Sequence, residues 1–124
     1  MKLKTLALAA GLACATGAIA APTQWTSASG GNDHWYEFVS TSVTWQDAFT
    51  AANAASFMSM GGYLATVTSA TENTFIANLA NGSLAWLGGS DAGNAINAWT
   101  WRNGPEAGQA FTYTGALEAK QRMD

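Results

Sequence analysis

The stretch GGYLATVTSATEN, residues 61–73, carries the local signals that decide the fold of this 124-residue chain. The glycine pair at its start suits an exit from a preceding helix, because glycine adopts positive φ without steric cost. Residues 63–67 alternate and are β-rich, which predicts a short strand. Ser69 and Glu72 then form a capping box, which predicts a helix that begins here, with Glu72 exposed in its first turn.

Two amphipathic helices are expected around this stretch. The helix after Ser69 has an apolar stripe and ends at Asn81-Gly82. Upstream, Thr44 and Asp47 resemble a second capping box, and alanines follow Trp45 at helical spacing. This earlier helix is predicted to end near residues 58–61. The two stripes consist of Trp45, Ala48, Ala52 and Ala55, and of Phe75, Ile76 and Leu79.

Strands are expected before and after the helices. Residues 34–39 favour the extended state, residues 85–87 form a compact apolar run, and residues 99–101 alternate with both indoles on one face. Residues 111–113 are expected to be a return strand. Helices in the first half and strands in the second indicate an α+β fold rather than a parallel-sheet fold.

Residues 1–20 have the pattern of a signal peptide. Lys2 and Lys4 precede an apolar run, and Ala18-Ile19-Ala20 fits a small-x-small cleavage site. The run is too short for a convincing membrane span. The single cysteine, Cys14, lies in this segment, but Gly11 stands where a lipidation signal has a branched apolar residue, which argues against a lipid anchor.

The remaining chain is expected to begin at Ala21, to be secreted or displayed on the cell surface, and to have no membrane segment. It holds three basic and eight acidic residues, a formal net charge of −5. So few basic groups cannot neutralise a phosphate backbone or an anionic lipid surface, so nucleic acid and membranes are unlikely partners. Residues 21–33, rich in Ser, Gly and Asn, are expected to form a flexible leader.

Five blocks stand out in the chain, at residues 44–48, 61–67, 69–73, 85–89 and 99–106. In their order and spacing they resemble a C-type lectin-like domain in its bacterial, exported, disulfide-free form. The resemblance implies two helices packed on short antiparallel strands. It implies a partial domain over residues 34–113, with the C-terminal part missing and an atypical tail at residues 114–124. Its signature positions here are Trp45, Gly62, Leu64, Glu72, Trp86, Gly88, Trp101 and Gly104.

The sugar-binding determinants of this family do not match this chain. Family members hold calcium with a carboxylate-Pro-Asn or Gln-Pro-Asp triplet and a later Trp-Asn-Asp, and calcium wants about 6–8 oxygen ligands. Asp91 matches one acid of an auxiliary calcium site, but Ala95 and Ile96 stand where the next ligand belongs. No cofactor is therefore expected. Calcium is expected only if a longer parent protein contains the long loop in which family members hold this ion.

Tryptophans are the remaining candidate ligand contacts. The family positions place Trp45, Trp86 and Trp101 in the core, whereas Trp25, Trp35 and Trp99 are expected to be more open. Trp35 and Trp99, with Asp91 as a candidate metal ligand, are the candidate site residues. His34 is the single histidine and is expected on the surface, so a Ser-His-Asp or Cys-His arrangement is improbable.

Three functions remain open from the sequence. The first is a secreted or cell-surface binding module, without catalysis, whose ligand is a carbohydrate or an extracellular protein. The second is a non-functional fragment of a longer lectin-like protein, because the pattern ends after Phe111. The third is a small exported enzyme, which no group of residues supports.

Overall fold

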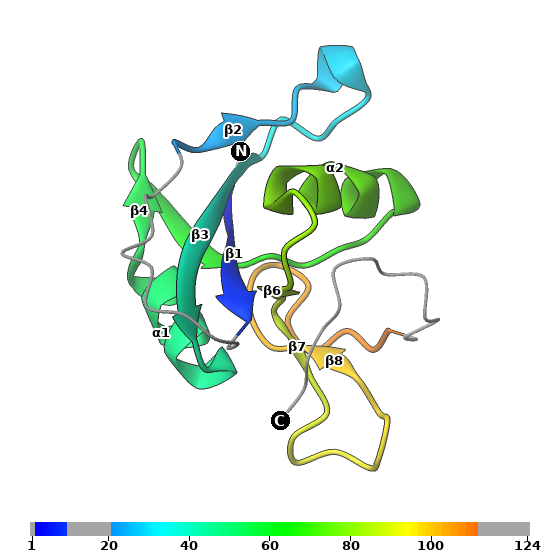
Figure 1. Ribbon diagram of the computed structural model, residues 1–124. Helices are drawn as coiled ribbons and strands as arrows, with labels where there is room; N and C mark the ends of the chain where they lie inside the picture. Colours follow the sequence, from blue (N-terminus) through cyan, green and yellow to red (C-terminus); the bar gives the residue numbers. More distant parts are fainter. Residues whose placement is uncertain (1, 10–20, 112–124) are drawn as a thin grey trace.

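A mixed sheet between two helices organises the molecule (Figure 1). The computed structural model describes residues 2–9 and 21–111. The six-stranded sheet has the order β2-β3-β1-β5-β4, with β6 pairing to β1 beyond β5, and β7 and β8 form a separate pair. This confirms the α+β class. The elements are β1 (Leu3–Ala9), β2 (Thr23–Gln24), the 3-10 turn η1 (Ser27–Ser29), β3 (Trp35–Val43), α1 (Trp45–Ala54), β4 (Ser56–Phe57), β5 (Met60–Leu64), α2 (Ala70–Ala80), β6 (Ala85–Trp86), β7 (Gly89–Ser90) and β8 (Thr100–Trp101).

The central strand, β1, comes from the segment that the sequence predicts to be a signal peptide. It runs parallel to β3 and to β5 and antiparallel to β6. The expectation of antiparallel strands alone is therefore wrong. These parallel partners are reached through long connections rather than through hairpins, which is what parallel pairing requires. Residues 10–20, which include the expected cleavage site and Cys14, lie outside the described residues, and cleavage stays a prediction.

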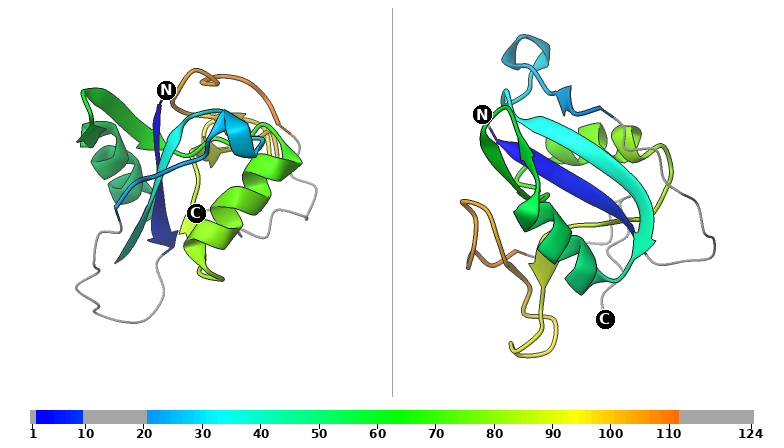
Figure 2. Two further views of the ribbon diagram at one scale, coloured as in Figure 1. Left: turned by 90° about the horizontal axis from the view of Figure 1, so that it is seen from above. Right: turned by 90° about the vertical axis from the view of Figure 1, so that its left-hand side faces the viewer.

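The helices cover opposite faces of the sheet, as both views in Figure 2 show. Both predicted caps are confirmed, since Thr44 accepts from the backbone N–H of Asp47 at 3.2 Å and Ser69 from that of Glu72 at 3.1 Å. The helix α1 ends at Ala54, earlier than expected, because the chain enters β4 at Ser56. The tight turn from β4 to β5 then uses positive φ angles at residues 58 and 59.

Apolar side chains gather on both faces of the sheet. Trp86 and Trp101 are buried as predicted, while Trp45 is half-buried. The indole N–H of Trp45 donates to the carbonyl of Leu87, and that of Trp86 donates to the carbonyl of Val43, both at 2.8 Å. These two bonds tie the start of α1 to β6. The α2-side cluster is Leu6, Tyr36, Ala65, Ile76, Ala85, Leu87 and Trp101, and the α1-side cluster is Ala48, Ala52, Leu64 and Trp86.

Residues 21–33, expected to be a flexible leader, are packed against the rest of the chain. Strand β2 pairs antiparallel with the start of β3. The ring of Trp25 stacks on Phe75 of α2, with centroids 5.3 Å apart, and meets Tyr36 edge-on. Burial of this indole outweighs the turn-forming composition of its neighbours.

Two signature glycines lie where a side chain has no room. A Cβ on Gly88 would lie 2.8 Å from the carbonyl oxygen of Leu64. Gly104 has a φ of 70°, and a Cβ there would lie 2.5 Å from the ring of Tyr63. Glycine at both positions therefore lets the β6 and β8 regions close onto β5.

Candidate binding site

The loop of residues 91–98, which joins β7 to β8, is the most exposed irregular segment among the described residues (Figure 1, yellow). Residues 92–98 are all exposed, and Ile96 is 91% exposed at the far end from the sheet. Binding residues commonly lie on loops held by a rigid scaffold. We call this segment the β7–β8 loop.

Internal hydrogen bonds hold the β7–β8 loop in one conformation. The amide of Asn94 donates to the carbonyl of Ala98 at 2.7 Å, and the guanidinium of Arg102 donates to the carbonyl of Ala92. The carboxylate of Asp91 accepts from the backbone N–H of Asn97 at 3.3 Å. A braced loop loses less conformational entropy when a ligand binds.

The candidate residues of the sequence do not meet at one site. Asp91 begins the β7–β8 loop, where its carboxylate braces the backbone. Trp99 lies at the foot of the same loop but is only 4% exposed, packed against Phe111, so the expectation of an open indole is wrong there. Trp35 starts β3, half-buried against Phe57 at a centroid distance of 5.1 Å.

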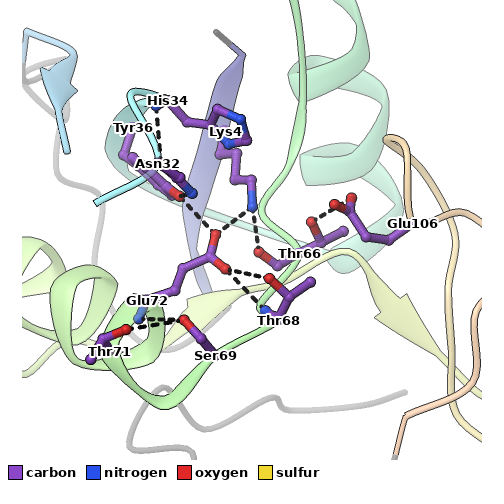
Figure 3. A network of polar contacts seen from close by, with 10 residues as sticks. All are labelled: Lys4, Asn32, His34, Tyr36, Thr66, Thr68, Ser69, Thr71, Glu72 and Glu106. Atoms are coloured by element: carbon purple, nitrogen blue, oxygen red, sulfur yellow. Dashed lines mark hydrogen bonds and ion pairs between the residues drawn. The ribbon is translucent and has the colours of Figure 1, made fainter. Parts of the chain in front are cut away.

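A buried polar network lies between β1 and α2 (Figure 3). The Lys4 ammonium forms an ion pair with the Glu72 carboxylate, and both side chains are 1% exposed. Lys4 also donates to the carbonyl of Thr66 at 2.9 Å, and the hydroxyl of Tyr36 donates to Glu72 at 2.7 Å. The expectation that Glu72 is exposed is therefore wrong, because its side chain turns from the cap toward the sheet.

The pKa values in this network follow from burial and from the ion pair. Burial by itself would raise the pKa of Glu72, but the hydrogen bond and charge of Lys4, with donors from Thr68 and Tyr36, lower that pKa below its ordinary 4.5. Burial raises the pKa of Tyr36, which stays a neutral donor. Glu72 is thus held as a carboxylate that accepts from strands β1 and β3 and from Thr68 in the loop before α2.

A second feature is a cavity of about 300 Å³ between the sheet and α1. Its walls include Val39, Val43 and the alanines of α1, with Glu37 and Asp47 among the polar groups. Burial raises the pKa of Glu37. The size reaches the lower end of small-molecule pockets. The surface of the lining is mostly apolar, and we assign the cavity no role in the proposed binding.

Residues 2–9 and 21–111 contain neither a metal-binding group nor a membrane-spanning helix. In these ranges no three His, Cys, Asp or Glu side chains form a group that could hold a metal ion. His34 is half-buried rather than on the surface, and burial, with the charges of Lys4 and Lys2, lowers its pKa from 6.5. None of the helices in these ranges has the length and apolarity needed to cross a bilayer.

Two relatives share sequence with part of this chain. The halomucin of Haloquadratum walsbyi is 42% identical over 78 residues, which make up 63% of this chain and 1% of halomucin. A type-2 ice-structuring protein of Hemitripterus americanus is 38% identical over 72 residues, 58% of this chain and 40% of that protein. The chain thus spans less than half the length of each. Neither a family model nor a solved structure matches.

Sequence reasoning missed two features of the site region. It gave no role to Ile96, whose exposure depends on where the loop projects. It read Lys4 as the charge of a signal peptide, and residues 3–9, Leu-Lys-Thr-Leu-Ala-Leu-Ala, show no alternation that would mark them as a strand. Leu3 to Leu6 are all buried in β1, so the burial of this strand does not follow a one-face pattern either.

Proposed function

We propose that this chain is a non-catalytic binding module of the C-type lectin-like class that acts outside the cell. Its ligand is a carbohydrate or an extracellular protein. The order of the sequence blocks supports the class, as do the buried Trp86 and Trp101 and the tight packing at Gly88 and Gly104. The signal-peptide pattern supports export, and the partial similarity to halomucin and to an ice-structuring protein is compatible with a binding role.

The β7–β8 loop is the observation that carries this proposal. It offers an apolar tip, Ile96, beside the amide and carboxylate groups of Asn94, Asn97 and Asp91. An apolar contact surrounded by a few fixed polar groups suits a sugar ring or a protein surface, since both present hydroxyl or amide groups around apolar patches. Charged residues make up only 10% of the chain, which fits a neutral ligand.

The test compares Ile96→Asp with Met58→Asp in the full-length protein. Met58 is the matched control, because it is another exposed apolar residue, 65% exposed, in the turn between β4 and β5. Both proteins are applied to a glycan array, to cell-envelope polysaccharides and to extracellular matrix proteins. We expect Ile96→Asp to weaken binding at least about tenfold, the order of 1.4 kcal/mol, and Met58→Asp to leave it unchanged.

A fourth measurement follows from the similarity to an ice-structuring protein. Inhibition of ice growth, measured as thermal hysteresis, distinguishes a water-structuring surface from a lectin-like one. A well-folded protein that binds none of the glycans or matrix proteins would contradict the proposed function. Equal loss of binding in both variants would contradict the assignment to the β7–β8 loop.

A further inference from the structure

The central position of β1 conflicts with the predicted fate of its residues. Strand β1 has hydrogen-bonded neighbours on both sides, with β3 along one side and β5 followed by β6 along the other. Leu3 and Leu6 are 1% and 0% exposed. Yet the same segment lies before a cleavage pattern that ends at Ala20. Cleavage there would cut the covalent link between β1 and the rest of the sheet.

The strip between β3 and β5 presents two backbone ladders to whatever strand lies in it. On the β3 side, Leu3 to Ala7 pair with Trp35 to Val39 in register. On the β5 side, Leu3 to Thr5 pair with Gly62 to Leu64. Main-chain pairing on two sides holds an extended peptide largely independently of its sequence. The strip is therefore a site for a strand, and β1 shows the conformation that fits.

Side chains beneath the strip select one residue of that strand by charge. The Glu72 carboxylate accepts from Lys4, from the hydroxyl of Tyr36 and from the backbone N–H of Thr68. The carbonyl of Thr66 accepts from the Lys4 ammonium as well. Without a cation above it, Glu72 would be a buried charge with no counter-charge, which is strongly unfavourable. The strip thus requires a basic residue at the Lys4 position.

The next inward position selects for an apolar side chain. Leu6 lies two residues after Lys4 on the same face of the strand and belongs to the cluster that holds Tyr36 and Ile76. A polar residue there would be buried among apolar groups without a partner. The strip therefore accepts an extended chain in which a basic residue is followed, two positions later, by an apolar residue.

We propose that this strip, bounded by β3 and β5, is a strand-acceptor groove. When cleavage after Ala20 removes the covalent segment, the groove takes an extended segment of another polypeptide, with lysine or arginine followed two positions later by an apolar residue. In the uncleaved chain, β1 fills the groove in the same way. This site lies within the central sheet, with the Lys4 and Leu6 positions facing α2. It is separate from the β7–β8 loop, so it goes beyond the proposed function.

The test begins with the full-length chain, made without export and carrying a protease recognition sequence between Cys14 and Ala15. The protein is cut and unfolded in urea, and the released N-terminal segment is removed. It is then refolded with a fluorescent peptide of residues 2–10. We expect the near-ultraviolet circular dichroism of the uncut protein to return only with peptide, together with a rise in fluorescence anisotropy that reports peptide binding.

Matched peptides and a matched host variant test the charge requirement. A peptide with Lys4→Arg should bind nearly as well, and one with Lys4→Glu more than about 100-fold more weakly, because it would place two carboxylates together. In a Glu72→Gln host, that discrimination should largely disappear. Main-chain pairing alone would not depend on the charge at this one position.

Several results would overturn the groove. One is a cut protein that refolds fully without any peptide, because the strip then needs no strand. A second is a cut protein that fails to refold in the presence of every peptide of the series. A third is equal binding of the Lys4 and Lys4→Glu peptides. Dimers formed by exchange of strands in place of peptide binding would assign the groove to a second copy instead. All these readouts are independent of the glycan and matrix binding measured with Ile96→Asp.

Discussion

Glu72 shows how one residue can serve two parts of the structure. Its backbone N–H is capped by Ser69, and its carboxylate accepts from Lys4 of β1 and Tyr36 of β3. The capping role was predictable from local sequence, because it depends on residues three apart. The ion pair was not, because Lys4 is 68 positions away in the chain and has a competing interpretation as a signal-peptide charge.

The lowered pKa of Glu72 predicts a loss of stability in acid. The unfolded chain takes up a proton near the ordinary pKa of 4.5, while the folded carboxylate resists protonation. Stability from this group is therefore complete above pH 4.5 and is lost as the pH falls through the depressed folded pKa. Urea unfolding at several pH values should show a shallower acid dependence in Glu72→Gln than in the parent protein.

Substitution of Glu37 provides a control in which the acid dependence of stability should change in the opposite direction. Burial raises the pKa of Glu37, so the stability from this group is present at low pH and is lost as the pH rises through the raised value. The Glu37→Gln variant should therefore show a steeper acid dependence than the parent. Parallel curves for the parent and Glu72→Gln would mean that the ion pair does not set the acid response.

At the scale of elements, what is local in the sequence was predictable and what is distant was not. The two helices, their caps, and the strands at β3, β6 and β8 follow from spacing, capping and β-rich runs. The strand expected at residues 63–67 overlaps β5 only at residues 63 and 64, because β5 begins at Met60 and includes the glycine pair. The end of α1 was misplaced, because the β4–β5 hairpin replaces its last expected turn. The parallel arrangement depends on contacts between distant segments, which no local pattern encodes.

Removal of the α2 cap should be measurable at this scale. In Ser69→Ala, the backbone N–H of Glu72 loses the hydroxyl that accepts from it at 3.1 Å. We expect the free energy of unfolding to fall by about 1 kcal/mol. Ser69→Asp, which keeps a capping oxygen, is the matched control and should retain most of the stability in the same urea titration. Equal losses in the two variants would show that the cap contributes nothing.

For the whole molecule, the contacts divide the chain into a sheet that unfolds together and a loop that opens alone. Strand β1 joins β3, β5 and β6, and separation of β1 from β3 or β5 exposes the buried Lys4 and Glu72. The β7–β8 loop is held by exposed hydrogen bonds among its own residues and to the side chains of Ser90, Thr100 and Arg102. Exposed hydrogen bonds of this kind open locally.

Hydrogen exchange of the full-length chain should resolve this division. We expect backbone amides in β1, β3 and β5 to exchange only through global unfolding, with rates that rise steeply with added urea. Amides of residues 92–98 should exchange by local opening, with little dependence on urea. If β1 amides exchanged as fast as those of the loop, β1 would not be an integral strand of the sheet.

The distance along the chain between Lys4 and Glu72 also has a consequence for synthesis. The N-terminal strand emerges from the ribosome first, but the carboxylate that neutralises its lysine is made 68 residues later. At about 5–20 residues per second, that interval lasts roughly 3 to 14 s. During this time the leucine-rich segment has no folded sheet to join. A cellular factor that recognises apolar N-terminal segments can therefore bind it before the sheet forms.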